Sequence, residues 1–274
     1  MSTIIIKIGG GRGIDPRDNA QEIARLISDG HRVVIVHGGS HETNELAEVL
    51  GHPAQTIVSP SGHESRRTDR RTMAIFMMSY CGKVNKTLVE SLRSLDVNAV
   101  GLSGLDAGIW IGTRKGAIRS IEEGRTVIIR DDLSGRVDSV DADFLNTLLD
   151  AGRVPVLTPP AGTADGIAIN VDADRAAAAT AAVMNADELL LLSNVRGVLR
   201  DPSDPGSLLT EVSMQDFTIA EESAQGRMKN KVLAAREALE AGVSRVVIGS
   251  ASGPDAIANA RSGSGSVFTN GVYA

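Results

Sequence analysis

The sequence contains a single cysteine, Cys81, in 274 residues. One thiol cannot form a disulfide within the chain, and it also excludes the paired cysteines of a CxxC metal site. No apolar run approaches the roughly 20 residues that a helix needs to span a bilayer. The chain opens with a strand-like run, Ile4 to Ile8, rather than with a signal peptide. We therefore expect a protein of the reducing cytoplasm that does not enter a membrane.

Lysine is also scarce, and the chain carries a net negative charge. The formal net charge is −6, which argues against general nucleic-acid binding. A compact ammonium is not interchangeable with a planar guanidinium, so each lysine in an arginine-rich chain is a candidate site residue. Only six of the 28 basic residues are lysines: Lys7, Lys83, Lys86, Lys115, Lys229 and Lys231. A GC-rich genome explains Lys83, Lys86 and Lys115 equally well.

Two familiar phosphate-binding motifs are missing. No segment matches the GxxxxGKS/T pattern of a P-loop. A GxGxxG dinucleotide fingerprint that began at Gly9 would need glycine at position 14, where the chain has Ile14. A nucleotide-using enzyme with this sequence must therefore cradle phosphate in another way.

Two glycine-rich turns offer that alternative. The apolar run Ile4–Ile8 leads into Gly9-Gly10-Gly11, and the run Arg32–Val36 leads into His37-Gly38-Gly39-Ser40. A strand that ends in bare N–H groups beside a helix N-terminus is a ready anion site. We expect both turns at one edge of a sheet, where they would hold one anion from two sides. Lys7, on the first strand, indicates that this anion is phosphate.

Short apolar strands alternate with helical patterns along most of the chain. The expected strands include 4–8, 32–36, 97–100, 154–158, 188–192 and 245–248, and the expected helices include 41–50, 69–95, 174–184 and 226–242. Residues 108–138 have the pattern of hairpins. This alternation predicts a mainly parallel sheet covered by helices on both faces, in one large domain or in two fused lobes.

The remaining polar residues fit phosphoryl transfer to an anionic acceptor. When two negative groups meet, cations and N–H donors must neutralise the group in transfer. Lys7 and Lys231 come from the two halves of the chain, and an aspartate of the run Asn170–Asp174 could hold both ammonium groups. Each part also has a purely structural explanation. The glycines could form ordinary tight turns, Asp172 or Asp174 could be a helix N-cap, and Lys229 and Lys231 could lie on a solvated face.

Five motifs resemble, in order, those of the amino acid kinase family. They are Lys7–Gly10, Val36–Gly39, Gly101–Gly104, Ile169–Asp174 and Leu192–Leu199. Within the family, the sequence is most similar to the acetylglutamate kinase branch, which phosphorylates a side-chain carboxylate to an acyl phosphate. The resemblance implies one α/β domain over residues 1–274, a three-layer αβα sandwich with a central, mainly parallel sheet. It also implies an amino-acid substrate lobe over about 1–165 and an ATP-binding lobe over 166–274.

The resemblance implies a role in the reaction for five residues. Lys7 and Lys231 would stabilise the transferring phosphoryl group, and Asp174 would organise the two lysines. Gly10 and Gly39 would donate backbone N–H groups to the phosphate and to the substrate carboxylate.

Further residues would hold the substrate and the nucleotide. Arg66 would grip the substrate α-carboxylate, Asn170 would orient the substrate, and Gly38 would add an N–H group beside Gly39. The nucleotide would contact Lys7, Gly9, Gly10, Ser193, Asn194, Gly197, Lys229 and Lys231. The implied cofactors are ATP and Mg²⁺. The metal would be held mainly by the nucleotide phosphates, and no residue is implied as its ligand.

Three segments depart from acetylglutamate kinases and are similar to the carrier-dependent aminoadipate kinases: Ser40–Asn44, Ser59–Arg66 and Gly226–Lys231. In those kinases the substrate amino group is capped by the C-terminus of a LysW-type acidic amino-group carrier protein. The resemblance thus implies phosphorylation of carrier-bound 2-aminoadipate or glutamate in lysine or arginine biosynthesis. Free N-acetylglutamate is the alternative substrate. A nucleotide or oxyanion storage protein is the non-enzyme alternative, and it predicts the loss of a catalytic lysine, whereas Lys7 and Lys231 are both present.

An acidic carrier requires a local basic patch, because this chain is itself net negative. Arg66, Arg67, Arg70 and Arg71 cluster at the start of the helix expected over 69–95, with Lys83 and Lys86 further along. This cluster is the predicted docking surface, and a solvated helix face is the alternative explanation.

The same helix has apolar side chains on more than one face. Those expected to point inward are Ile75, Met78, Val84 and Leu88. The surplus consists of Met73, Phe76, Met77 and Tyr80. Such a surplus indicates either a second buried surface in a homodimer or a helix buried on both sides within one chain. Because members of the resembled family pair through their N-terminal halves, we expect a homodimer.

Overall fold

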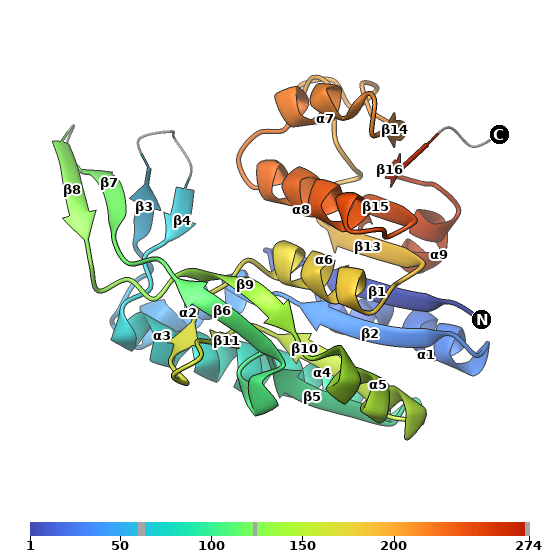
Figure 1. Cartoon of the computed structure of the whole chain (residues 1–274), viewed down its shortest axis with the longest axis horizontal. Helices are drawn as coiled ribbons and strands as arrows, with labels where there is room; N and C mark the ends of the chain where they lie inside the picture. The colour runs from blue at the N-terminus through green and yellow to red at the C-terminus, as the bar shows by residue number, and fades with distance from the viewer. Residues whose placement is uncertain (60–63, 123–124, 272–274) are drawn as a thin grey trace.

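The computed structural model describes residues 1–59, 64–122 and 125–271. Its centre is an eight-stranded sheet in the order β14-β16-β15-β13-β1-β2-β10-β5 (Figure 1). All neighbouring pairs are parallel except β15 and β16, so the predicted mainly parallel sheet is confirmed. The strands are β1 (Thr3–Ile8), β2 (Arg32–His37), β5 (Ala99–Ser103), β10 (Val154–Thr158), β13 (Glu188–Ser193), β14 (Glu211–Ser213), β15 (Arg245–Ser250) and β16 (Ser266–Thr269).

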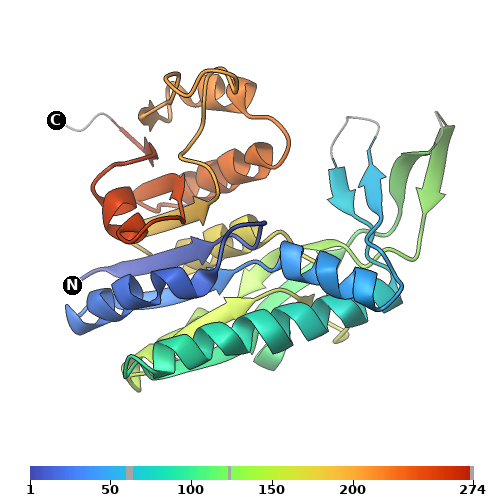
Figure 2. The same ribbon diagram turned by 180° about the vertical axis from the view of Figure 1, so that it is seen from behind.

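Helices cover both faces of this sheet, because side chains of buried strands alternate between two apolar layers. Ile4, Ile6 and Ile8 of β1 pack with α1 (Ala20–Ser28), α4 (Asn85–Arg93) and α9 (Ala256–Arg261), the helices nearest the viewer in Figure 2. Ile5 lies in the opposite layer, with α5 (Ala142–Asp150), α6 (Ala173–Val183), α7 (Phe217–Ser223) and α8 (Met228–Glu240). The three-layer αβα sandwich is therefore confirmed.

Aspartate caps fix the start of several helices. The carboxylates of Asp69, Asp141 and Asp172 each accept a backbone N–H at the N-terminus of α3 (Arg70–Met77), α5 and α6. Such caps satisfy N–H groups that have no partner within the helix. The caps place the first turn of α6 at a defined position above the sheet.

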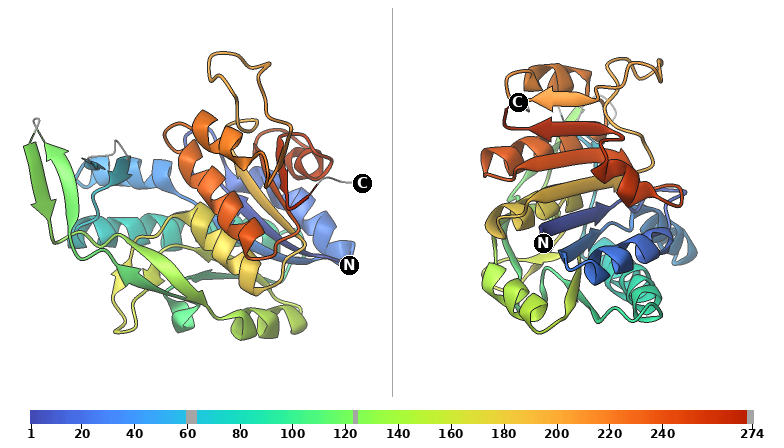
Figure 3. Two further views of the ribbon diagram at one scale, coloured as in Figure 1. Left: turned by 45° about the horizontal axis from the view of Figure 1, so that its top comes forward. Right: turned by 90° about the vertical axis from the view of Figure 1, so that its right-hand side faces the viewer.

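Smaller β elements extend from one end of the sandwich. A four-stranded sheet has the order β12 (Ala168–Ile169), β11 (Ala161–Gly162), β6 (Trp110–Arg114) and β9 (Gly135–Val140). Two hairpins, β3–β4 (Thr56–Val58 and Glu64–Arg66) and β7–β8 (Ile118–Glu122 and Arg125–Ile129), project side by side from that end (Figures 1 and 3). The predicted carrier-kinase segment Ser59–Arg66 includes residues 60–63, which lie outside the described residues.

Two predictions of local structure need correction. The helix expected over 69–95 is present as one helical run, made of α3, a π-helical segment (Met78–Val84) and α4 (Asn85–Arg93), but the inward position expected for Met78 is wrong. The wide π turn changes the helical register, so Met78 is 57% exposed while Ile75, Val84 and Leu88 are buried as predicted. The strand expected over 97–100 instead covers Ala99–Ser103, where it pairs with β10.

The apolar surplus of the 69–95 segment is mostly buried within the chain. Met73, Phe76 and Tyr80 form a small cluster with Leu133 and Ala168, and Met77 packs against its edge. This burial explains most of the pattern without a second subunit. In the described part of the chain, no helix is long and apolar enough to span a bilayer.

Candidate active site

A cleft of about 890 Å³ opens where β1, β2 and β13 end. Lys7, Gly38 and Ser193 lie on its floor at the carboxyl ends of these three neighbouring strands. Arg66 of β4 and Arg114 of β6 line one side, and the first turns of α6 and α8 line the other. Carboxyl ends of parallel strands are where ligands bind in open α/β sheets. The fold therefore brings both halves of the chain to one site.

The two glycine turns touch each other at the floor of the cleft. Gly9 donates its N–H to the Leu192 carbonyl at 2.8 Å, and Gly38 donates to the Ile8 carbonyl at 2.9 Å. A Cβ atom added to Gly10 would lie 2.0 Å from the Gly39 nitrogen, so this approach requires glycine at position 10. Gly39 caps α2 (Ser40–Val49), and its Cα faces the Tyr80 ring. The expectation that both turns share one sheet edge is thus met by their geometry.

A buried ion cluster joins the two predicted lysines. The Lys7 Nζ lies 2.7 Å from Asp174 Oδ1, and the Lys231 Nζ lies 2.7 Å from Asp174 Oδ2. Lys7 is only 5% exposed, Asp174 6% and Lys231 8%. Lys7 is on the same face of β1 as Ile5, which points it toward the first turns of α6 and α8.

The electrostatics of this cluster keep its carboxylate ionised. Burial raises the pKa of Asp174, but the attraction of Lys231 and Lys7 outweighs it, so the net pKa lies far below the usual range. Burial lowers the pKa of Lys7, helped by repulsion from Lys231 and opposed by Asp174. Burial also disfavours the charge of Lys231, yet Asp174 reverses this and raises its pKa. One carboxylate thus balances two cations, which leaves net positive charge for an anionic ligand.

The start of α6 resolves an ambiguity that the sequence left open. Asp172 is the N-cap, since its Oδ1 accepts the N–H groups of Asp174 and Arg175 at 3.0 Å. Its Oδ2 accepts the Asn230 amide at 2.9 Å, which ties α6 to α8. Asp174 is therefore free to serve as the charge partner of the lysines.

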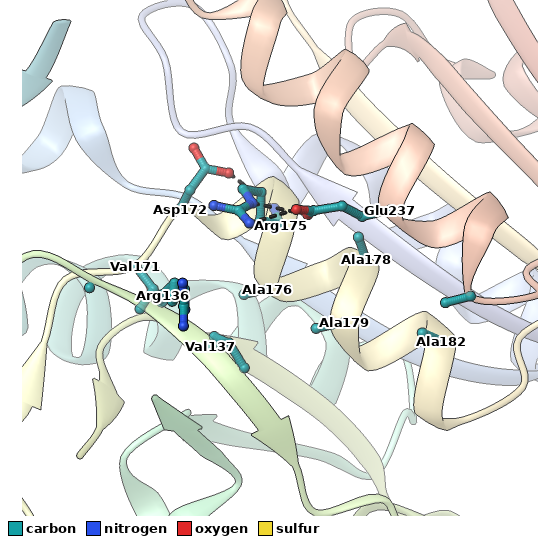
Figure 4. Close-up of a pocket in the computed structure, with 12 residues that line it drawn as sticks. Arg136, Val137, Val171, Asp172, Arg175, Ala176, Ala178, Ala179, Ala182 and Glu237 are labelled. Atoms are coloured by element: carbon teal, nitrogen blue, oxygen red, sulfur yellow. Dashed lines mark hydrogen bonds and ion pairs between the residues drawn. The ribbon is translucent and has the colours of Figure 1, made fainter. Parts of the chain in front are cut away.

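A smaller cavity of about 220 Å³ lies behind Asp172, along α6 (Figure 4). Alanine side chains of α6 line it, and the Arg175 guanidinium pairs with the Glu237 carboxylate of α8 beside them. Figure 4 shows these two side chains pointing toward each other across the gap between the helices. This pair is a second tie between α6 and α8, and sequence reasoning missed it because nothing local links the two positions.

Arg66, which lines the cleft on the side of β4, has a guanidinium nitrogen available to bind an anion. Its Nη2 donates to the Ser40 carbonyl at 3.3 Å and to the Asn44 side chain. Its Nη1 is buried and has no hydrogen-bond partner among the described residues. Burial lowers the pKa of Arg66, although guanidinium remains charged near neutral pH. A buried donor without a partner is costly unless a ligand supplies the acceptor.

The other predicted substrate residue, Asn170, also lines the cleft. Its amide donates to the Thr68 hydroxyl at 2.9 Å, which links the loop before α6 to the segment after Arg66. Tyr80 and Phe76 stack with ring centroids 3.9 Å apart and form an aromatic wall nearby. Sequence reasoning noted these aromatics only as apolar residues of a helix.

The predicted nucleotide residues divide into two groups. Ser193 and Asn194 line the cleft, and the buried Ser193 hydroxyl has no partner in the described part of the chain. Gly197 and Lys229 are not part of the described lining. A Cβ on Gly197 would lie 2.6 Å from the Ser266 hydroxyl, so this glycine allows close packing. Lys229 is exposed on the first turn of α8.

Further basic side chains surround the mouth of the cleft, and among them the sequence singled out only Lys115. Arg114 donates to the carbonyls of Asp132 and Arg130, so no carboxylate neutralises it in these bonds. Lys115 and Arg227 also line the cleft, as do Arg136 and Arg175, which pair with the carboxylates of Asp138 and Glu237. The acidic side chains there are Asp172 and Asp174. Such an excess of cations suits a polyanionic ligand, and only the fold gathers these scattered residues.

Comparison with known proteins gives the family to which the chain is similar. The family model described as amino acid kinase family matches residues 2–250. A LysW-aminoadipate kinase of Deinococcus radiodurans is 50% identical over 269 residues, covering 98% of this chain and 92% of that protein. The enzyme of the same name from Thermus thermophilus is 45% identical, covering 96% and 99%. An acetylglutamate kinase of Methanopyrus kandleri is 39% identical, covering 89% and 93%.

Solved structures support the fold. N-acetylglutamate synthase from Neisseria gonorrhoeae superposes with a TM-score of 0.79 at 24% identity, and the match covers 99% of this chain. The chain spans 60% of that synthase. Carbamate kinase from Giardia lamblia superposes with a TM-score of 0.67 at 18% identity, covering 98% and 99% of the two chains. At these identities the likeness concerns the sandwich architecture alone.

Proposed function

Since the chain belongs to the amino acid kinase family, we propose that it uses ATP to phosphorylate the side-chain carboxylate of carrier-bound 2-aminoadipate or glutamate. The products would be an acyl phosphate and ADP, in lysine or arginine biosynthesis. The observation that carries the proposal is the buried Lys7–Asp174–Lys231 cluster beside two touching glycine turns. The relatives named LysW-aminoadipate kinase favour an amino-group carrier of the LysW type over an acetyl cap.

The residues of the cleft would divide the work of phosphoryl transfer. The free Nη1 of Arg66 would bind the substrate α-carboxylate, and Asn170 would orient the substrate. Lys7 and Lys231, with the N–H groups of the glycine turns, would neutralise the phosphoryl group in transfer. Asp174 would hold both ammonium groups in place. Preorganised donors of this kind each contribute about 10²- to 10³-fold to turnover.

ATP and Mg²⁺ are the proposed cofactors. No group of three or more His, Cys, Asp or Glu side chains in the described residues could hold a metal ion. The proposed Mg²⁺ would be held mainly by the nucleotide phosphates, where it would neutralise their charge. We assign ATP to the lobe 166–274 and the amino-acid substrate to 1–165. Ser193 and Asn194 would contact the nucleotide, whereas Gly197 and Lys229 would act indirectly, by shaping the turn after β13 and the start of α8.

The carrier would dock over the basic mouth of the cleft. The predicted patch at the start of α3 is partly neutralised, since Arg67 pairs with Asp131 and Lys83 pairs with Glu42. Lys115 and Arg227, in contrast, line the mouth itself. An acidic carrier would approach this mouth by electrostatic attraction, which salt screens over about 10 Å at 0.1 M.

A homodimer and a cytoplasmic location are further parts of the proposal. Met78, exposed on the π-helical segment, is the apolar side chain of that segment that remains for a subunit contact. Light scattering at micromolar concentration should give the mass of a dimer, and a strictly monomeric species would contradict it.

A kinase assay with three acceptors tests the proposed function. Carrier-bound aminoadipate, carrier-bound glutamate and free N-acetylglutamate are compared with ATP, and hydroxylamine traps the acyl phosphate. We expect turnover with a carrier-bound substrate and little with N-acetylglutamate. Turnover with N-acetylglutamate alone would identify the alternative kinase. Nucleotide binding without turnover on any acceptor would favour the storage protein.

A further inference from the structure

His37, at the end of β2, is a buried titratable residue that the proposed mechanism does not use. Its side chain is 0% exposed. Val33 and Ile35 pack on the face of the sheet covered by α1 and α4, and the alternation of β2 puts His37 on that face. Lys7 points to the opposite face. His37 therefore lies beneath the Gly38–Gly39 turn, on the side away from the ion cluster.

The hydrogen bonds of His37 define its tautomer. The Asn85 Nδ2 lies 3.0 Å from His37 Nε2 and also donates to the Val156 carbonyl at 3.0 Å. The Asn85 Oδ1 accepts a bond from Lys86 at 3.1 Å, which fits the same orientation of the amide. Because an amide nitrogen only donates, Nε2 must accept, and the ring proton lies on Nδ1. His37 Nδ1 then donates to the Gly38 carbonyl at 2.9 Å.

The surroundings keep this imidazole neutral. Burial lowers the pKa of His37 to about 4, and the positive charges of Lys7 on β1 and Lys86 on α4 act in the same direction. The group that contacts the ring from α4 is the neutral Asn85 amide, whose other hydrogen bond goes to the Val156 carbonyl of β10. At pH 7 the ring is thus neutral, and its single N–H donates one hydrogen bond in a fixed direction.

The bond to Gly38 has a consequence on the other side of the turn. In a trans peptide the carbonyl and the next N–H point in opposite directions. Holding the Gly38 carbonyl back toward His37 therefore turns the Gly39 N–H away from it, toward the hydroxyl of Tyr80, which lines the cleft. The Gly38 N–H donates to the Ile8 carbonyl, and the Gly39 carbonyl accepts from the N–H and hydroxyl of Thr43. The backbone groups on both sides of this peptide are therefore fixed. A glycine pair has little intrinsic preference that would hold the peptide without the imidazole.

We propose that His37 is a positioning residue for phosphoryl transfer: its Nδ1–H tautomer, selected by Asn85, orients the Gly38–Gly39 peptide so that Gly39 presents its N–H to the anion. This inference rests on the proposed function for its catalytic meaning. The orientation of the peptide itself is independent of which acceptor is phosphorylated.

Nitrogen-15 NMR of histidine-labelled protein tests the tautomer directly. The His37 signal is identified by its loss in the His37→Asn variant. We expect one Nδ1–H imidazole that does not titrate between pH 6 and pH 8. In a second sample, labelled at glycine, the Gly39 amide signal should shift when AMP-PNP and Mg²⁺ are added. An Nε2–H tautomer, or titration near pH 6.5, would overturn the inference. This readout needs no substrate, so failure of the proposed function can be told apart from failure of the inference.

Two substitutions separate positioning from packing. His37→Asn places an amide donor near the position of Nδ1, whereas His37→Leu fills the space without a donor. Both lose the bond to Asn85. We expect His37→Asn to keep kcat within about tenfold and His37→Leu to lose about 100-fold, with the Kd for AMP-PNP changed less than threefold in both. Equal kcat in the two folded variants would overturn the proposal.

Asn85→Ala keeps the imidazole and decides the matter if His37→Leu does not fold. Without the Asn85 donor, both tautomers become accessible to His37. We expect a mixed tautomer population in the NMR spectrum and a fall in kcat that follows the lost Nδ1–H fraction. A full Nδ1–H population, or a mixed population with unchanged kcat, would contradict the role assigned to this network.

Discussion

Replacing Asp174 with Asn tests the central ion cluster, because it keeps the shape of the side chain and removes its charge. Two buried ammonium groups that now share one carboxylate, each at 2.7 Å, would then share none. Removing one partner of a buried ion pair typically costs about 3–5 kcal/mol of stability. Asp174 is 6% exposed, so little solvent screening reduces this figure. Turnover should fall at least 100-fold, because neither lysine keeps its position.

The stability loss should depend on pH with a definite sign. The folded pKa of Asp174 lies below its unfolded value, so in the wild type its contribution is present at neutral pH and lost as the pH falls through the acidic range. In the variant, burial and the repulsion between the two ammonium groups lower the folded pKa values of Lys7 and Lys231, and only the weaker attraction of Asp172 opposes them. The unfolded chain then binds more protons than the folded one between those values and about 10.4, so the stability of the variant rises with pH. The difference in the free energy of unfolding between wild type and variant should therefore be large at pH 7 and smaller at pH 10.

Urea denaturation at pH 5, 7, 9 and 10, with kcat measured at pH 7, checks both statements. Asp150→Asn is the matched control, because Asp150 pairs with Arg32 while 67% exposed. Such an exposed pair contributes about 0–1 kcal/mol. A loss for Asp174→Asn no larger than that of Asp150→Asn, or a gap that widens with pH, would refute the ion-cluster reasoning.

Three further predictions concern the rest of the cleft. Lys231→Ala should lower kcat by about 100- to 1000-fold, since Lys7 still pairs with Asp174 and the fold survives; near-normal turnover in a coupled assay would exclude its role. Gly10→Ala should abolish turnover and lower the Tm, because the new Cβ would lie 2.0 Å from the Gly39 nitrogen, whereas Gly11→Ala, with no atom within 4 Å, should change neither. Arg66→Leu should raise the acceptor KM at least tenfold and leave the ATP KM unchanged; equal effects on both would place the α-carboxylate elsewhere.

Docking of the carrier gives one more prediction. Lys115→Glu and Arg227→Glu, at the cleft mouth, should raise the KM for the carrier-bound acceptor and flatten its salt dependence. Arg153→Glu is the control, because this exposed residue lies just before β10, at the opposite end of the sheet. If all three variants behave alike, the carrier does not approach this mouth.

The sheet could be predicted from the sequence because buried parallel strands are continuous apolar runs between turns. Leu189 to Leu192 is such a run, and its bounds were predicted almost to the residue. The register of the long helix could not be predicted, because a π turn at Met78–Val84 leaves no periodic signature. The small peripheral strands were missed for another reason: strands of two residues, such as Ala161–Gly162, are too short for any pattern.

The site was predictable in part. The residues on the floor of the cleft could be predicted from the glycine turns and the sparse lysines, because both are visible in the local sequence. The choice between Asp172 and Asp174 required the fold, because both lie at the start of one helix and only three-dimensional packing shows which faces Lys7. The cations at the mouth, such as Arg114 and Arg227, come from segments more than 100 positions apart, and no spacing rule connects them.

The two faces of the sheet edge have different tasks. Ile8 lies beside His37 and Lys7 lies beside Val36 in the paired strands β1 and β2. Alternation therefore sends the charged residue toward α6 and the imidazole toward α4. A second cation under the turn would push the pKa of Lys7 lower still, since Lys231 already acts in that direction. A neutral imidazole avoids this cost, because it orients a peptide through a hydrogen bond and adds no charge. One face of the sheet thus supplies the positive charge for the anion, and the other face supplies the hydrogen bond that orients the peptide beside it.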